Sequence, residues 1–483
     1  MLHRSSCMPS SHSHTSHDQS TTDSDTATPR IPQVSGKVWG PAHLGDLSVH
    51  LPAELVDAAL EATKSRQRRI RALPSRVIVY FVVALALFPE LGYKSVFAKL
   101  CLGAGVLGTV SASGLAQARR RVGVGPLRWI FELIRGAAPT VTGAGDWFRS
   151  LRVCAIDGTI LTLADTSSIL AKYSKHACYH GGTGYPQARV VALIACGTRS
   201  IIDAVFGPTS LGETTQTPAL LPSMGPGMII LADRNFAAAA LLHRISDTGA
   251  HYLVRVKNAR HLPVCQDLTD GSYLSVLAGR KVRVITAAIT LHTEGGQRTD
   301  MYRLITTLTD PAQGTAKELM GLYHQRWEIE TAFREIKSTM GGGRVLRSRT
   351  VVLVEQEIYA LLIAEQLLRT VMSEATNAVP GLAPDRASFT IALTLARDTI
   401  ILGPVPAAAG AGPGWQQLTG RIGANLLANL LPARRLRTGP RTVKRAISKY
   451  QARATKPHGP TQKARLTIEI INPTAGLTES TRP

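Results

Sequence analysis

The hydrophobic pattern changes period between residues 150 and 260, and this change constrains the fold more than any other feature. Short apolar runs of β type replace the longer helical pattern that precedes them. Five such runs occupy residues 151–156, 189–195, 200–206, 228–232 and 252–256. A short helical stretch (217–224) separates the third run from the fourth, and another (237–246) separates the fourth from the fifth. This order predicts a domain of mixed α/β architecture.

Helices and further strands flank this segment. Residues 40–140 read as mostly helical, and residues 257–310 are again strand-rich. A strong helix is predicted over residues 319–340, where Thr315 and Glu318 form a capping box and three glycines end the helix. Three strands, helix, strand, helix and strand is the order of an RNase H-like α/β fold. We therefore expect an RNase H-like core with a β-rich insertion, preceded by an all-α domain.

The charge of the chain points to a polyanionic partner. Lys and Arg number 55 against 33 Asp and Glu, a net charge of +22. Nucleic acid is the commonest such partner, and an anionic membrane surface is the alternative. The longest apolar run, residues 77–88, would span about 18 Å as a helix, which is short of a hydrocarbon core of roughly 30 Å. Six widely spaced cysteines without a C-x-x-C pair exclude a zinc knuckle.

Arginines form two clusters in the helical region. Both clusters lie in or beside short helices, a pattern typical of DNA-backbone contact. The alternative is a solvated helical face, which the sequence leaves open. The clusters consist of Arg68, Arg69 and Arg71 and of Arg119, Arg120 and Arg121.

Two aspartates directly follow apolar strand runs. Asp157 comes after the run ending at residue 156, and Asp233 comes after the run ending at residue 232. If the two strands lie side by side, both carboxylates face one site, and hard divalent cations need such oxygen ligands. Either aspartate alone reads more simply as a turn or cap residue, but the pair in this strand order favours a site.

The predicted helix over residues 319–340 supplies a third carboxylate. At 100° per residue, one stripe of about 60° holds four polar residues beside the buried face. These are Tyr323, Arg326, Glu330 and Lys337. Glu328 and Glu335 fall on the opposite side, so we expect their substitution to be neutral. An ordinary amphipathic helix with i,i+4 pairs explains the same pattern, and geometry alone does not decide between the two readings.

The spacing Tyr323-x2-Arg326-x3-Glu330-x6-Lys337 resembles the Y-x2-R-x3-E-x6-K signature of the bacterial insertion-sequence transposases called the YREK group. The strings beginning at Asp157 (Asp-Gly-Thr) and Asp233 (Asp-Arg-Asn-Phe) also resemble that family, although a glycine is common where Asn235 stands. Residues 44–100 look like the helical domain that precedes the catalytic core in these proteins. The resemblance covers roughly residues 40–375.

The resemblance implies a DDE transposase that moves an insertion sequence by cut-and-paste. Two Mg²⁺ ions, for which Mn²⁺ can substitute, would be held by Asp157, Asp233 and Glu330. Arg326 and Lys337 would hold phosphates of the DNA end, while Tyr323 and Trp327 would contact the DNA end itself. The family chemistry nicks the DNA, forms a hairpin on the transposon end, reopens it and joins target DNA.

The implied partners are the terminal inverted repeats and target DNA, bound by a homodimer in a synaptic complex on the bacterial nucleoid in the cytoplasm, with no membrane partner. A related RNase H-like nuclease or resolvase is one alternative. A domesticated, catalytically silent DNA-binding protein is another, although the intact carboxylates disfavour it.

We expect a disordered polar leader (1–39), a helical DNA-binding domain (40–145), a catalytic domain (150–375) interrupted at about 257–310, a helical and linker region (376–430) and a basic tail (431–483).

Overall fold

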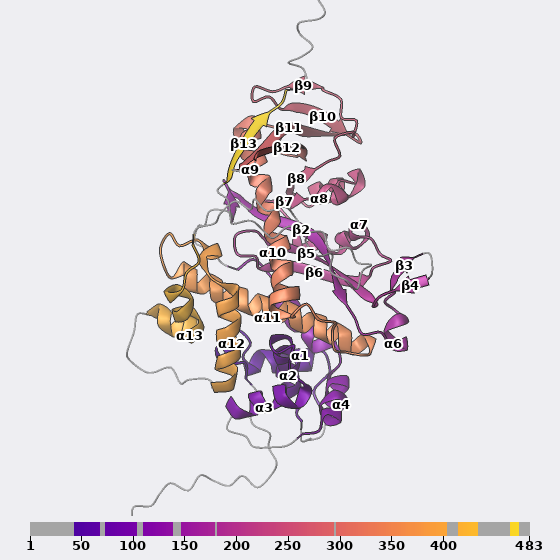
Figure 1. The fold of residues 1–483 in the computed structure, drawn as a ribbon, viewed down its shortest axis with the longest axis vertical. Helices are drawn as coiled ribbons and strands as arrows, with labels where there is room; N and C mark the ends of the chain where they lie inside the picture. Colours follow the sequence, from indigo (N-terminus) through magenta and orange to yellow (C-terminus); the bar gives the residue numbers. More distant parts are fainter. Residues whose placement is uncertain are drawn as a thin grey trace, which may run out of the picture. The chain divides into compact units, whose positions relative to one another are not determined.

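The computed structural model describes residues 43–67, 73–103, 110–138, 146–178, 181–293, 296–402, 414–432 and 464–472 (Figure 1). The predicted leader 1–39 lies outside the described residues, as do Arg68, Arg69 and Arg71.

The amino-terminal part is helical, as predicted. Ser111 caps one of its helices, because its side chain accepts a hydrogen bond from the backbone N–H of Gly114. The apolar run at 77–88 is a buried helix, and no helix in the described ranges is long and apolar enough to cross a membrane. The elements are a 3-10 turn Gly45–Val49 and the helices α1 Ala53–Ala62, α2 Ser75–Leu87, α3 Tyr93–Gly103, α4 Ala112–Val122 and α5 Gly125–Ile134.

A mixed sheet follows in the order β6-β5-β2-β7-β8-β12-β11-β10-β9. The pairs β2–β7 and β7–β8 are parallel, and the other neighbours are antiparallel. In chain order the strands are β2 Leu151–Thr162, β5 Gln187–Ala195, β6 Ile201–Pro208, β7 Met228–Ala232, β8 His251–Arg255, β9 Gln266–Asp267, β10 Tyr273–Leu277, β11 Arg280–Thr293 and β12 Gly296–Thr306.

Shorter elements complete the sheet region. The strand β1 Trp147–Phe148 pairs with β2, and a separate hairpin is formed by β3 His176–Cys178 and β4 Gly181–Thr183. The strand β13 Ala464–Ile470 pairs with β11, although the sequence predicted only a basic tail there. The connecting helices are α6 Ser167–Leu170, α7 Glu213–Gln216 and α8 Ala239–Asp247, with 3-10 turns Thr217–Ser223 and Arg234–Phe236.

The helix predicted over residues 319–340 is a composite of helical types. The capping box of Thr315 and Glu318 is confirmed. The path then runs through α9 Ala316–Tyr323, a 3-10 turn His324–Arg326, α10 Trp327–Arg334 and a π-helical segment Glu335–Met340. The expectation of one uniform α-helix is therefore wrong, and π turns of this kind are frequent at functional sites.

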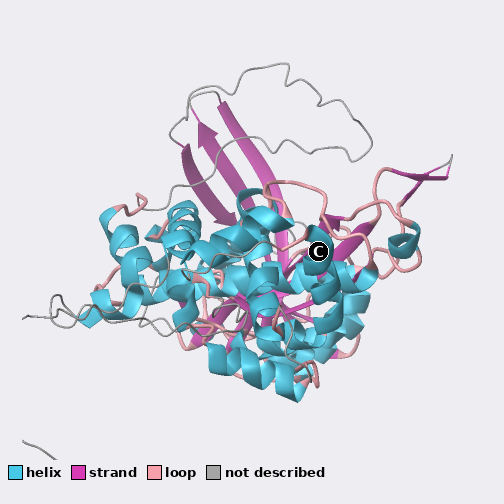
Figure 2. Cartoon of the chain, turned by 90° about the horizontal axis from the view of Figure 1, so that it is seen from below, coloured by secondary structure: helices cyan, strands magenta, loops and turns pink. Residues whose placement is uncertain are grey.

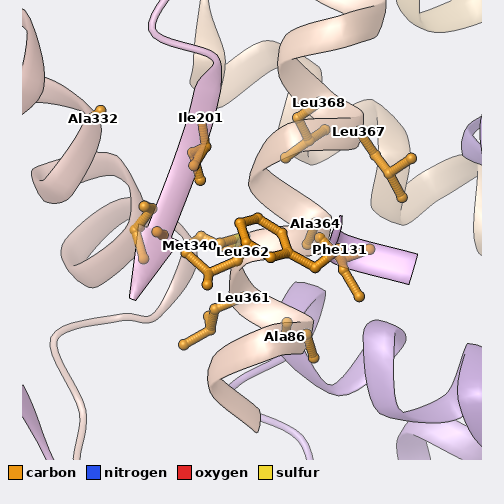
Figure 3. Packing of buried hydrophobic residues seen from close by; sticks show 14 of the residues in the cluster. Ala86, Phe131, Ile201, Ala332, Met340, Leu361, Leu362, Ala364, Leu367 and Leu368 are labelled. Atoms are coloured by element: carbon orange, nitrogen blue, oxygen red, sulfur yellow. The ribbon is translucent and has the colours of Figure 1, made fainter. Parts of the chain in front are cut away.

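The long helix α11 Val351–Asn377 joins the helical region to the sheet, and α12 Phe389–Leu402 and α13 Gly414–Ala428 pack beside it. One continuous hydrophobic core contains residues from α2, α5, β6 and α11. Figure 3 shows side chains of this core, among them Ala86, Phe131, Ile201 and Leu362. Helices surround the middle of the sheet in Figure 2, and a second core that includes Leu241 and Leu242 of α8 lies on the opposite sheet face. The helical region and the sheet region thus share apolar packing.

Arg119 is part of this junction, and the prediction that it contacts DNA is wrong. Its guanidinium is fully buried and contacts the Tyr93 hydroxyl. It donates hydrogen bonds to Gln356 Oε1 at 3.3 Å, Ser348 Oγ at 3.3 Å and the carbonyl oxygen of Leu353 at 3.2 Å. Arg119 therefore ties α4 to the start of α11, whereas its neighbours Arg120 and Arg121 are exposed.

Replacing Arg119 by alanine should destabilise the protein by about 2 to 4 kcal/mol, because it opens a cavity and leaves buried acceptors without donors. Thermal unfolding followed by circular dichroism measures the effect as a lower Tm. Arg120→Ala on the exposed face of the same helix is the matched control and should change stability by less than about 0.5 kcal/mol. Equal Tm values for the two variants would contradict the anchoring role of Arg119.

Candidate active site

The register of β2 with β7 brings the two aspartates together. The parallel pairing ends at Ala155 opposite Leu231, so Asp157 and Asp233 each lie two residues beyond that pair. The expectation that Asp157 follows the end of its strand is wrong. β2 continues to Thr162 and pairs Asp157 with Ala192 of β5. Because β7 stops at Ala232, the other side of β2 is uncovered at this level, and this leaves room for a site.

Local backbone hydrogen bonds fix both carboxylates. The backbone N–H of Gly158 donates to Asp157 Oδ1 at 2.8 Å. The backbone N–H of Asn235 donates to Asp233 Oδ1 at 2.8 Å, so Asp233 caps the 3-10 turn that follows β7. Each aspartate therefore has one oxygen held by the backbone.

The composite helix carries Glu330 to the same place. Arg326 lies between two carboxylates, with Nη1 at 3.3 Å from Asp157 Oδ2 and Nη2 at 3.1 Å from Glu330 Oε1. Lys337 Nζ donates to Thr159 Oγ1 at 3.2 Å. The structure thus brings together Asp157, Asp233, Glu330, Arg326 and Lys337 around one pocket of about 410 Å³. The pocket is also lined by Gly158, Thr159, Phe333, Arg334 and Ser338.

Burial shifts the protonation equilibria in the pocket. Burial raises the pKa of Asp157 to about 7, and the negative charges of Asp233 and Glu213 act in the same direction. The hydrogen bond from Gly158 and the charge of Arg326 oppose this increase in the pKa. Burial also lowers the pKa of the Lys337 ammonium. Burial is thus the main cause of the raised pKa of Asp157, and the neighbouring carboxylates add to it.

The donor set suits a hard divalent cation in kind, since it consists of three carboxylates. The arrangement is not that of a preformed cation site. No group of three or more His, Cys, Asp or Glu side chains in the described part of the chain is close enough to hold a metal ion. Arg326 instead contacts Asp157 and Glu330, two of the three carboxylates that would hold an ion.

Tyr323 is buried, which is not the exposed position that a DNA contact requires. Its hydroxyl donates to the carbonyl oxygen of Ala232 at 3.1 Å, and its ring meets the ring of Tyr302 edge-on at 6.5 Å. Tyr323 thus fastens the helix to the end of β7, directly before Asp233. Trp327 is half-buried, and the Arg326 guanidinium lies 5.3 Å from its ring centroid.

Two charged residues near the pocket are absent from the sequence-based prediction. Arg255 ends β8, one residue beyond the parallel pair Ala232–Val254, and therefore lies beside Asp233. Its guanidinium stacks 3.9 Å from the Tyr302 ring centroid. Glu213 packs so closely on Gly158 that a Cβ there would lie 2.3 Å from Glu213 Oε1. Arg255 could have been predicted as a site residue, because it is a cation at the end of an apolar strand run. No local sequence pattern marks Glu213.

Glu328 and Glu335 lie on the side of the helix away from the pocket, as predicted, but they do not face solvent. Both are buried and ion-paired. The expectation that their substitution is neutral therefore conflicts with their burial, because removing one partner of a buried ion pair is strongly destabilising.

Comparison with known proteins agrees with this arrangement. Residues 41–132 match the family model for the insertion element 4 transposase N-terminal region, and residues 149–366 match the transposase DDE domain. The chain is 27% identical over 421 residues to the transposase InsG for insertion sequence element IS4 of Escherichia coli K12, covering 84% of this chain and 93% of that protein. It is 28% identical over 214 residues to the putative transposase InsZ of the same organism, covering 42% of this chain and 69% of that protein.

Among solved structures, the chain is similar to a piggyBac transposase synaptic complex with hairpin DNA, at 12% identity and a TM-score of 0.38, covering 82% of this chain and 83% of that chain. A TM-score this low does not establish a common fold. The two family models together account for most of the chain between residues 41 and 366. The chain therefore belongs to the IS4 family of DDE transposases.

Proposed function

We propose that this transposase cleaves and rejoins DNA strands at the ends of an insertion sequence, with Asp157, Asp233 and Glu330 as its catalytic carboxylates. The observation that carries the proposal is their meeting in one pocket from three separate segments, with Arg326 held between two of them. We also assign the sheet β6-β5-β2-β7-β8 to an RNase H-like core and the helix signature to the YREK group. The antiparallel-then-parallel strand order and the shared helix stripe support both assignments.

Asp157, Asp233 and Glu330 would hold two Mg²⁺ ions, or Mn²⁺ in their place. When bound, such ions supply the Lewis acidity that phosphodiester displacement needs. Three carboxylates lining one pocket support a cation there, since hard divalent cations prefer oxygen ligands. Arg326 would exchange its carboxylate partners for a DNA phosphate, since a guanidinium pairs equally well with either anion.

Three cations would hold phosphates of the DNA end beside the carboxylates. Arg326 and Lys337 line the pocket, and Arg255 stands at its edge beside Asp233. Arg255 forms no ion pair with a carboxylate in the described ranges, and stacking on Tyr302 restrains its guanidinium. Trp327 would meet the DNA end next to Arg326. These contacts would place the scissile phosphodiester at the carboxylates.

The helical region would supply much of the remaining DNA affinity, through the exposed Arg120 and Arg121 and through the cluster at Arg68, Arg69 and Arg71. The regions 1–39, 40–145, 150–375, 376–430 and 431–483 stay our proposed division of the chain. We further propose that a homodimer brings two terminal inverted repeats together with target DNA on the bacterial nucleoid, in a cut-and-paste reaction with a hairpin on the transposon end.

Asp157→Asn, Asp233→Asn and Glu330→Gln should each reduce cleavage of a labelled transposon end by about 10³-fold or more, because each removes a charge on which the reaction depends. Binding of the same DNA in a gel shift should change by less than about twofold, since phosphates contacted elsewhere carry most of the affinity. Glu132→Gln, at a half-exposed carboxylate of α5, is the control. Cleavage that survives Glu330→Gln would contradict the assignment of the third carboxylate.

Arg255→Ala and Lys337→Ala should lower the cleavage rate at saturating DNA by about 10²-fold, because each removes a charge directed at the scissile region. The affinity for a scrambled duplex should fall much less. Arg280→Ala, at an exposed arginine paired with Asp247, is the matched control and should leave both quantities unchanged. A uniform loss of affinity for any duplex, with normal cleavage at saturation, would contradict this placement.

Arg120→Ala together with Arg121→Ala should flatten the salt dependence of DNA-end binding by about one to two units, at a slope near 0.9 per phosphate neutralised. Replacing Arg68, Arg69 and Arg71 should flatten it by about one to three units on the same basis. Fluorescence anisotropy between about 50 and 200 mM salt measures the slope. An unchanged slope in both variants would show that these clusters are solvated faces and that the DNA footprint lies elsewhere.

A further inference from the structure

A buried network of charges lies behind the catalytic helix. Arg199, in the turn between β5 and β6, places Nε at 2.7 Å from Glu328 Oε2 and Nη1 at 3.3 Å from Glu335 Oε1. Arg369 of α11 contacts Glu335 from another side and places Nε at 2.9 Å from Glu365 Oε1. All five side chains are at most 13% exposed, so this network is part of the interior.

The network contacts the composite helix on the face opposite the pocket. Glu328 and Glu335 are seven residues apart, as are Glu330 and Lys337, which face the pocket. Two parallel stripes therefore run along the same segment, one bound by arginines and one lining the site. A helix is stiff over two turns. Fixing Glu328 and Glu335 therefore also fixes the rotation of the helix about its axis and its position along that axis, and so the placement of Glu330 and Lys337.

Glu335 is also the first residue of the π-helical segment Glu335–Met340. A π-helix has a different pitch from an α-helix. The residue at which this segment begins therefore determines the position of the Lys337 ammonium. Apolar contacts hold this region as well: Ala332 and Met340 join the core cluster that contains Ile201 of β6 and Leu368 of α11 (Figure 3). Apolar contacts persist when a helix rotates slightly. Hydrogen bonds from one guanidinium to two carboxylates are directional, so they restrict such a rotation more strongly.

Arg199 occupies an unfavourable backbone conformation to make these contacts. Its φ of 60° lies in the left-handed region, where arginine is uncommon and glycine is preferred. A tight turn alone would be better served by glycine or asparagine at this position. The side chain therefore makes interactions that offset the backbone cost, and its guanidinium contacts the two carboxylates of the helix.

We propose that Arg199 is a positioning residue for the transposase reaction, which fixes the placement of Glu330 and Lys337 by clamping Glu328 and Glu335 on the back of their helix. This inference rests on the proposed function of the pocket. A buried ion pair often adds little stability compared with apolar residues of the same size, so a gain in conformational specificity is the more fitting explanation for the network.

Arg199→Lys tests the proposal, because lysine keeps the charge but is a point donor that does not reproduce the guanidinium fork. We expect the cleavage rate at saturating DNA and Mg²⁺ to fall by about tenfold to a hundredfold, the loss that a displacement of about 1 Å can cause. The Kd for the DNA end should stay within about twofold. The matched control is Arg283→Lys, since Arg283 is a fully buried arginine paired with Asp270 that touches neither Glu328 nor Glu335.

Tm is measured first for Arg199→Lys and Arg283→Lys. Their cleavage rates are then compared at a temperature at which both variants are folded. A rate loss in Arg199→Lys alone supports the positioning role. A wild-type rate, or the same loss in both variants at the same loss of Tm, overturns it. Should Arg199→Lys not fold, Glu328→Gln carries the test, since Arg199 keeps its contact with Glu335: a slower cleavage rate supports the proposal, and an unchanged rate overturns it.

The proposed function has its own control in this design. Wild-type protein has to cleave the transposon end in the presence of Mg²⁺, and Glu330→Gln has to fail. If wild-type protein does not cleave, the proposed function is wrong. If it cleaves and Arg199→Lys is indistinguishable from Arg283→Lys, only the positioning role is wrong.

Discussion

The parallel pairing of β2 with β7 determines where the rest of the site can form. It sets Asp157 and Asp233 at the same level of the sheet, and the early end of β7 opens the space beside β2. The composite helix has to reach that space from the far side of the β-rich insertion. One of its attachments is the hydrogen bond from Tyr323 to the carbonyl oxygen of Ala232, the last residue of β7. The end of β7 therefore contributes to both the strand register and the placement of the helix.

Sequence periodicity drew attention to the three proposed catalytic carboxylates because each lies beside an apolar pattern, although the family resemblance was needed to choose Glu330. Asp157 and Asp233 follow strand runs, and Glu330 lies at the edge of a helical stripe. The same reasoning failed for Arg119, although Arg119 lies four residues after Leu115 and three before Val122, on the buried face. Its hydrogen-bond partners come from residues 93, 348, 353 and 356, and no local pattern announces them.

Other features depend on tertiary contacts that a single sequence does not encode locally. A uniform rotation of 100° per residue puts Glu328 and Glu335 on the outer side of an isolated helix. In the folded chain that side meets Arg199 and Arg369, so it becomes interior. The π-helical segment and the strand β13 are similar cases, since the first is held by those arginines and the second by the open edge of β11. Composition alone marked the β13 region as a basic tail.

The wide separation of the three carboxylates along the chain has a consequence for protein synthesis. A growing polypeptide acquires Asp157 and Asp233 well before Glu330, and domains fold from the amino terminus as they emerge. Until α10 and the packing helix α11 have been translated, the two aspartates have neither their third partner nor the core that holds it in place. A product that ends between Asp233 and Glu330 therefore carries two of the three proposed catalytic carboxylates and lacks the third.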